Sequence, residues 1–169
     1  MAAMSPNDFY EGFVYEDFSD WKDEPESIRK AFHVAVSAFH LADHYCRYHQ
    51  IRSPTFQKLY GKDAIRDEGL NKFQEALRNR QPLFAVIQDM ATAYKHLYTR
   101  SRCSISSGGS IEYVKYEGNS IEHSDAGEAE DWHIVIRHRT GVVTKFSNAI
   151  EAVIQMWSDI IDQRKPFVG

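Results

Sequence analysis

Four histidines lie within one short stretch of the chain, HVAVSAFHLADHYCRYH, which covers residues 33–49. Because successive residues of a helix are rotated by about 100°, His33, His40 and His44 project within about 40° of one direction, opposite an alanine-rich face. His49 turns toward the apolar face. Such a polar stripe is typical either of the solvated face of a surface helix or of a pair of metal ligands on one helix.

The metal interpretation depends on His40 and His44, which are one helical turn apart and so could bind the same ion. A further ligand would have to come from another helix, and we predict Asp89 in that place. His96 or Asp43 would be the other candidates. No Glu follows His40 in the manner of the zinc protease motif. The predicted cofactor is therefore a divalent metal bound by His40, His44 and Asp89.

Lys95 and His96 are adjacent in a basic part of the chain. A histidine beside cationic groups can act as an acid or a base on RNA, while the cations hold phosphate. The alternative is a helix C-terminal turn whose cations complement the helix dipole. We predict His96, Lys95 and His40 as catalytic residues, in a common cleft between the two helices that carry them.

Other catalytic signatures are missing. The SSGGS stretch, residues 106–110, lacks the Lys and the helix of a phosphate-binding loop, so no cofactor-binding residues are predicted. Cys46 and Cys103 have no metal-like spacing, and Cys46 falls on the inferred core face, which argues against a nucleophile. Whether the protein is an enzyme at all stays open.

The charge distribution permits two interpretations. Residues 1–27 hold eight acidic side chains against Lys22 alone, whereas residues 47–102 hold eleven basic and five acidic side chains. An acidic arm could lie on a basic body, or the basic face could bind a polyanion such as RNA. The start of the chain lacks the segments of a secretory signal, and no apolar run approaches the roughly 20 residues of a membrane span. We expect a cytoplasmic protein without a membrane partner.

The elements that must position these residues are predicted within a single domain, 1–169, because 43% hydrophobic and 26% charged residues are ordinary for a globular chain. Residues 1–26 form an acidic aromatic arm, expected to be extended and packed on the domain or on a second subunit. Residues 27–102 form the helical part. Its expected helices begin near Ser27, run from Pro54 to just before Gly61 with Ser53 as the N-cap, and cover about 63–80 and 82–102.

Residues 103–169 are predicted to form a β-hairpin region and a C-terminal helix. In SIEYVKYE and DWHIVIRHRTGVVTKF, β-branched and aromatic residues alternate with polar ones, and RTG is a tight-turn sequence. A last helix begins at Ser147 or Asn148, with Asn148 and Glu151 as a capping box. The predicted fold class is α+β: an N-terminal, mainly helical bundle, then a small three-stranded antiparallel sheet and a C-terminal helix.

Two stretches, AVSAFHLADHY and QDMATAYKHLYTR, resemble an uncharacterised group of bacterial and phage-associated proteins. In that group an alanine-rich helix ends with a His-Leu-x-Asp-like step, and a later helix carries Asp-x-Ala-x-x-x-Lys-His. The matching residues here are His40, Leu41, Asp43, Asp89, Ala91, Lys95 and His96. This chain departs from the group at Thr92, where Asn is frequent.

Paired helices of this kind also resemble the HEPN superfamily, small helical domains that include RNA-cleaving toxins, defence proteins and inactive scaffolds. The resemblance covers about a third of the chain and implies a HEPN-like helical hairpin. The superfamily's ribonuclease motif has four to six residues between an Arg and a His, and no Arg of this chain has a His at that spacing. Arg29 and His33 are one residue too close. RNA cleavage by the usual motif is therefore in doubt.

These observations predict a cytoplasmic, HEPN-like helical protein that binds RNA or a protein partner, in phage- or defence-related biology. Two alternatives come from other classes. One is a metal-dependent hydrolase with a His/Asp site between helices. The other is a structural homo-oligomer that buries the aromatic arm and the C-terminal helix between subunits.

Overall fold

The computed structural model describes residues 4–61, 67–96, 111–116, 131–137, 143–163 and 166–169. Only the main chain is described for residues 67, 93–96, 111–116, 131–133, 135, 137 and 143. The helices are α1 Pro6–Phe9, the π-helix η1 Tyr10–Tyr15, α2 Glu16–Asp23, α3 Ile28–Arg52, α4 Pro54–Tyr60, α5 Asp67–Arg80, α6 Phe84–His96 and α7 Phe146–Ile161. The strands are β1 Ile111–Tyr116, β2 Asp131–Arg137 and β3 Val143–Lys145.

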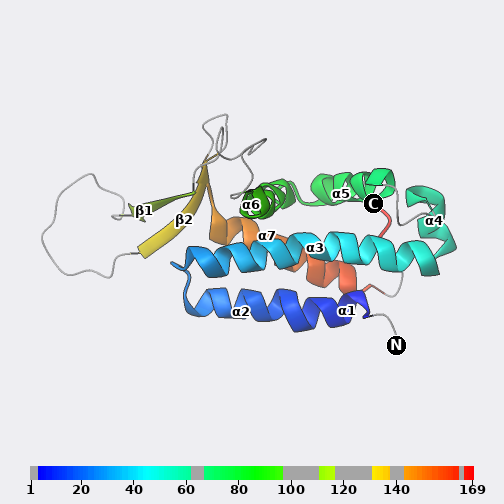
Figure 1. Ribbon diagram of the computed structural model, residues 1–169, viewed down its shortest axis with the longest axis horizontal. Helices are drawn as coiled ribbons and strands as arrows, with labels where there is room; N and C mark the ends of the chain where they lie inside the picture. Colours follow the sequence, from blue (N-terminus) through cyan, green and yellow to red (C-terminus); the bar gives the residue numbers. More distant parts are fainter. Residues whose placement is uncertain (1–3, 62–66, 97–110, 117–130, 138–142, 164–165) are drawn as a thin grey trace, which may run out of the picture.

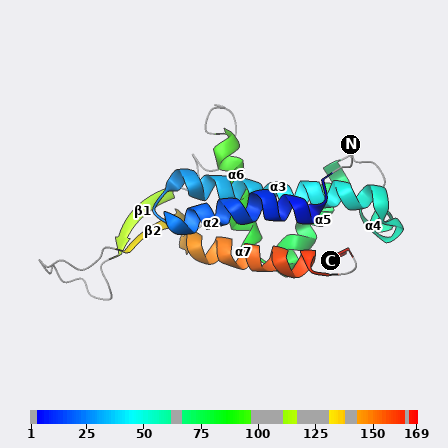
Figure 2. The same ribbon diagram turned by 90° about the horizontal axis from the view of Figure 1, so that it is seen from below.

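Helix α3 lies at the centre of the arrangement (Figure 1). The N-terminal helices α1, η1 and α2 run alongside it in the opposite direction, and α7 packs against both α3 and α6. Helix α6 crosses α3 (Figure 2). The strands lie at the end of the molecule where α7 begins, and both chain termini lie toward the other end. No helix in the described part combines the length and the apolar character that crossing a membrane requires.

The predicted α+β fold class is wrong, because the fold is mostly helical. Helix accounts for 81% of the residues described in full, and strand accounts for one two-residue stretch of that set. The main chain of β1, β2 and β3 pairs antiparallel in that order. Two described side chains of β2, Ile134 and Ile136, pack into the core that the helices form. The strands are therefore an appendage to a helical fold and not a second layer.

The extended arm predicted for residues 1–26 is also wrong, because residues 6–23 form one helical segment, α1-η1-α2. A capping box starts it: the Ser5 hydroxyl accepts from the Asp8 amide at 3.1 Å, and the Asp8 carboxylate accepts from the Ser5 amide at 3.1 Å. Tyr10, Val14 and Trp21 are buried against the rest of the fold. These apolar residues recur at helical spacing, so helix formation buries them together and leaves the acidic residues outside.

Helix ends that depend on local chemistry match the predictions. The hydroxyl of Ser27 accepts from the Lys30 amide at the start of α3, and the hydroxyl of Ser53 accepts from the Phe56 amide at the start of α4. Gly61 follows α4 with φ of 82°, a conformation that glycine adopts without steric cost. These three predictions are confirmed.

Helix starts that depend on tertiary packing differ from the predictions. Helix α7 begins at Phe146, and the capping box of Asn148 and Glu151 is wrong, since Lys145 is the N-cap and gives no side-chain cap. Phe146 is fully buried and its ring is perpendicular to that of Trp21, with centroids 5.1 Å apart, which draws the helix start into the core. Helix α6 begins at Phe84, two residues later than predicted. The predicted start at 63, the end at 102 and the RTG turn at 139–141 lie outside the described residues.

The core lies where the alanine-rich face of α3 meets α6 and α7. Ala31, Ala35, Ala38 and Ala42 are fully buried, and such small side chains allow neighbouring helices a close approach. Trp157 of α7 is also fully buried, and its Nε1 donates a hydrogen bond to the Ala38 carbonyl at 3.0 Å. The indole therefore fills the space above the small residues and satisfies its one polar group there.

A glycine sets the distance between α5 and the end of α4. A Cβ on Gly69 would lie 1.8 Å from the Tyr60 carbonyl oxygen and 2.9 Å from Nε2 of Gln50. That Nε2 donates to the same carbonyl at 3.0 Å, so both neighbours are already fixed. The helix tolerates the low propensity of glycine here because no other residue fits.

We predict that Gly69→Ala lowers the free energy of unfolding by about 1–3 kcal/mol, because the added methyl meets backbone that cannot move aside. Gly12→Ala is the matched control. A Cβ on Gly12 meets nothing within 4 Å, so alanine there should stabilise the fold by up to about 1 kcal/mol. Urea denaturation of both variants measures the difference. Equal stability of Gly69→Ala and the wild type would contradict the close approach.

Candidate functional site

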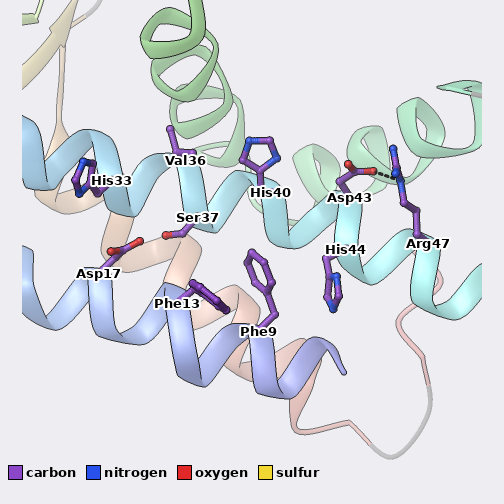
Figure 3. A pocket seen from close by; sticks show the side chains of 10 residues that line it. All are labelled: Phe9, Phe13, Asp17, His33, Val36, Ser37, His40, Asp43, His44 and Arg47. Carbon is purple, nitrogen blue, oxygen red and sulfur yellow. Dashed lines mark ion pairs between the residues drawn. The ribbon is translucent and has the colours of Figure 1, made fainter. Parts of the chain in front are cut away.

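A groove of about 530 Å³ lies between the N-terminal helical segment and α3 (Figure 3). Its volume is within the range of ligand-binding clefts. Ten side chains line it: Phe9, Phe13, Asp17, His33, Val36, Ser37, His40, Asp43, His44 and Arg47. The histidine stripe predicted on the first long helix is therefore one wall of a groove. The facing wall comes from the segment that we expected to be an extended arm.

The π-helix η1 shapes the aromatic part of the groove. Phe9 and Phe13 face the groove, with ring centroids 5.0 Å apart, while Tyr10 and Val14 of the same stretch are buried on the core side. Phe13 keeps 47% of its surface exposed. π-Helical turns are rare and occur frequently at functional sites. This one presents an uncovered aromatic ring beside the polar stripe.

His44 holds the N-terminal end of the groove in place. Its Nε2 lies 3.0 Å from the Met4 carbonyl oxygen, and its ring stacks on Phe9 with centroids 5.0 Å apart. Because a carbonyl oxygen can only accept, Nε2 must carry the hydrogen. That nitrogen therefore has no lone pair with which to bind a metal ion, and the contact assigns His44 a structural task.

Asp43 and Arg47 form an ion pair across one turn of α3, with 2.8 Å between Oδ1 and Nε. The Oδ1 atom is buried and has no partner among the described residues that meets hydrogen-bond geometry. Its charge is therefore compensated by the ion pair with the Arg47 guanidinium. Among the ten lining residues, Arg47 is the one lysine or arginine, and the carboxylate of Asp43 pairs with its charge. The groove therefore offers a polyanion little unpaired positive charge.

The residues predicted for catalysis and metal binding are only partly brought together. His40 and His44 both line the groove, whereas Asp89 is exposed on α6 and is not among the lining residues. The fully described side chains contain no group of three or more His, Cys, Asp or Glu arranged to hold a metal ion. Lys95 and His96 lie in the last turn of α6, where only the main chain is described, so their cleft with His40 stays a prediction.

The three lining residues of the facing wall, Phe9, Phe13 and Asp17, were not predicted as site residues. They recur at intervals of four, which is the spacing of one helical face. That periodicity was the available signal. The high acidic charge of residues 1–27 outweighed it in the prediction of an arm.

The fourth histidine of the stretch lies apart from the groove, as predicted. His49 packs against Tyr45, with ring centroids 4.4 Å apart, and lines a separate cavity of about 160 Å³ near the chain ends. Burial, with a smaller effect from the charge of Arg52, lowers the pKa of His49 to about 4. Burial likewise raises the pKa of Cys46 to about 12, which agrees with an inert thiol. Cys103 lies outside the described residues.

We predict that His49 makes the fold less stable in weak acid. The imidazole titrates near 6.5 in the unfolded chain and near 4 in the folded one, so the unfolded state binds more protons between these values. Stability therefore falls as the pH drops from about 6.5 to about 4. His49→Phe, which keeps an aromatic ring, should reduce the loss of unfolding free energy between pH 7 and pH 4.5. An identical loss in the variant would show that His49 is not its cause.

Comparisons of this chain with protein-family models, with curated proteins and with solved structures gave no match. The resemblance to the HEPN superfamily therefore stays a prediction. The groove between α1-η1-α2 and α3 has to be interpreted from its own geometry.

Proposed function

We propose that this chain is a protein-interaction module that holds a segment of a partner protein in the groove between α1-η1-α2 and α3. The observation that carries the proposal is the exposed ring of Phe13, which stands beside Phe9 inside a groove of about 530 Å³. Aromatic side chains in such positions supply a large share of binding energy when a partner covers them. The cytoplasmic location expected from the sequence belongs to the same proposal.

The dimensions of the groove favour an elongated ligand. Its lining on α3 extends from His33 to Arg47, and at 1.5 Å per residue this distance is about 21 Å. A helix of about four turns, or about six residues of extended chain, has that length. The histidine and serine side chains along this wall can donate or accept hydrogen bonds to a bound segment.

The charges around the groove favour the protein partner over RNA. RNA binding was predicted from the basic stretch 47–102, but Arg47 is the residue of that stretch that lines the groove, and Asp43 pairs with it. The facing wall belongs to residues 4–27, where eight acidic side chains accompany Lys22 alone. A polyphosphate chain would be repelled by that wall. The hydrolase and homo-oligomer alternatives receive no comparable support from the groove.

The first test selects peptides from a displayed random library on the purified protein and measures their affinities by fluorescence anisotropy. We expect Phe13→Asp to weaken the selected peptides by about tenfold or more, because the aromatic anchor is replaced by a charge. Tyr15→Asp is the matched control: Tyr15 is 51% exposed on the same π-helix but does not line the groove, so its variant should bind as the wild type does.

Two outcomes would contradict the proposal. One is equal weakening by both variants, which would place the binding surface elsewhere. The other is a library that yields no peptide while labelled RNA binds in a salt-dependent manner, which would restore the RNA prediction.

A further inference from the structure

Resting on the proposed function, we infer that the bound segment is a basic amphipathic helix, with two apolar side chains one turn apart followed by lysine or arginine about one turn further along. The inference comes from the order in which aromatic and acidic side chains follow one another along the groove. Phe9, Phe13 and Asp17 follow one another on the same wall, so two aromatic rings are succeeded by a carboxylate.

The spacing of this wall matches the spacing of a helix. The rings of Phe9 and Phe13 have centroids 5.0 Å apart, close to the rise of one helical turn. Apolar side chains at i and i+4 of a partner helix would therefore each meet one ring. Four residues beyond Phe13, the carboxylate of Asp17 would meet the next side chain on that face of the partner.

The chemistry at that position selects a cation. The face of an aromatic ring attracts ammonium and guanidinium groups, and so does a carboxylate. Among the ten lining residues, the formal charges are those of Asp17, Asp43 and Arg47 with histidine counted as neutral, and the last two form an ion pair. Asp17 is thus the one formal charge of the lining that this pairing leaves over.

The surroundings of the groove reinforce this selection. Glu16 and Asp20 are exposed on the same helix as Asp17. Lys30, near the start of α3, forms an ion pair with Glu24, with 2.8 Å between Nζ and Oε1. A basic segment would approach a wall of matching opposite charge, which raises the association rate as well as the specificity.

The experiment uses three synthetic peptides of about 16 residues that share one amphipathic helical pattern and differ only at the polar positions, which carry Lys, Gln or Glu. Binding to the full chain is measured by anisotropy at about 50 mM and about 500 mM salt. We expect the Lys peptide to bind about tenfold more tightly than the Glu peptide at low salt, and the difference to shrink at high salt.

Asp17→Asn should weaken the Lys peptide several-fold and leave the Gln peptide unchanged. Asp20→Asn is the matched control, because it removes an equal charge from the same helix at a residue that does not line the groove, and it should preserve the preference. If Asp17→Asn fails to fold, the salt dependence of the wild type decides the same question. Equal affinities for all three peptides, still abolished by Phe13→Asp, would overturn the inference and leave the proposed function standing. Peptide binding that never depends on Phe13 would overturn both.

Discussion

The structure depends on one constraint, which is that one face of α3 must carry only small side chains. Its buried alanines, with Ala38 in the middle, let α6 and α7 approach the helix axis closely. Trp157 closes the junction, since its indole is fully buried and its one donor is satisfied by the Ala38 carbonyl. A larger residue at Ala38 would displace α7, and with it the contact between Phe146 and Trp21 that anchors the N-terminal helices.

Because one face of α3 is buried in the core, the opposite, polar face is available to line a binding site. The helical segment α1-η1-α2 packs along the edge between the two faces and covers the polar face only in part. The groove follows from this partial cover. The same helix therefore supplies both the centre of the core and one wall of the candidate site. Because packing in the core holds the α3 backbone rigid, it also fixes the positions of His33 and His40.

The sequence predicted those parts of the fold that short-range chemistry determines. Ser27 and Ser53 mark helix starts because a hydroxyl before a helix satisfies a free amide, and this holds whatever surrounds it. The polar stripe of α3 was also predicted from its periodicity. The facing wall was not, because charge was weighed above spacing in residues 1–26, and the choice of an α+β class gave the strands more weight than the helical core allows. Gly69 lowers the helix propensity of α5, and its close approach to the Tyr60 carbonyl explains its presence there.

The groove exists only if residues 6–23 form a packed helical wall rather than a solvated acidic arm. Native-state amide hydrogen exchange tests it most directly, because protection requires both the helical hydrogen bonds and their burial. In a packed helical wall, we expect the amides of Val14 and Trp21 to exchange as slowly as that of Leu41 in the middle of α3. Exchange of these two amides at the rate of an unstructured chain would contradict it, and the groove would lose one of its walls.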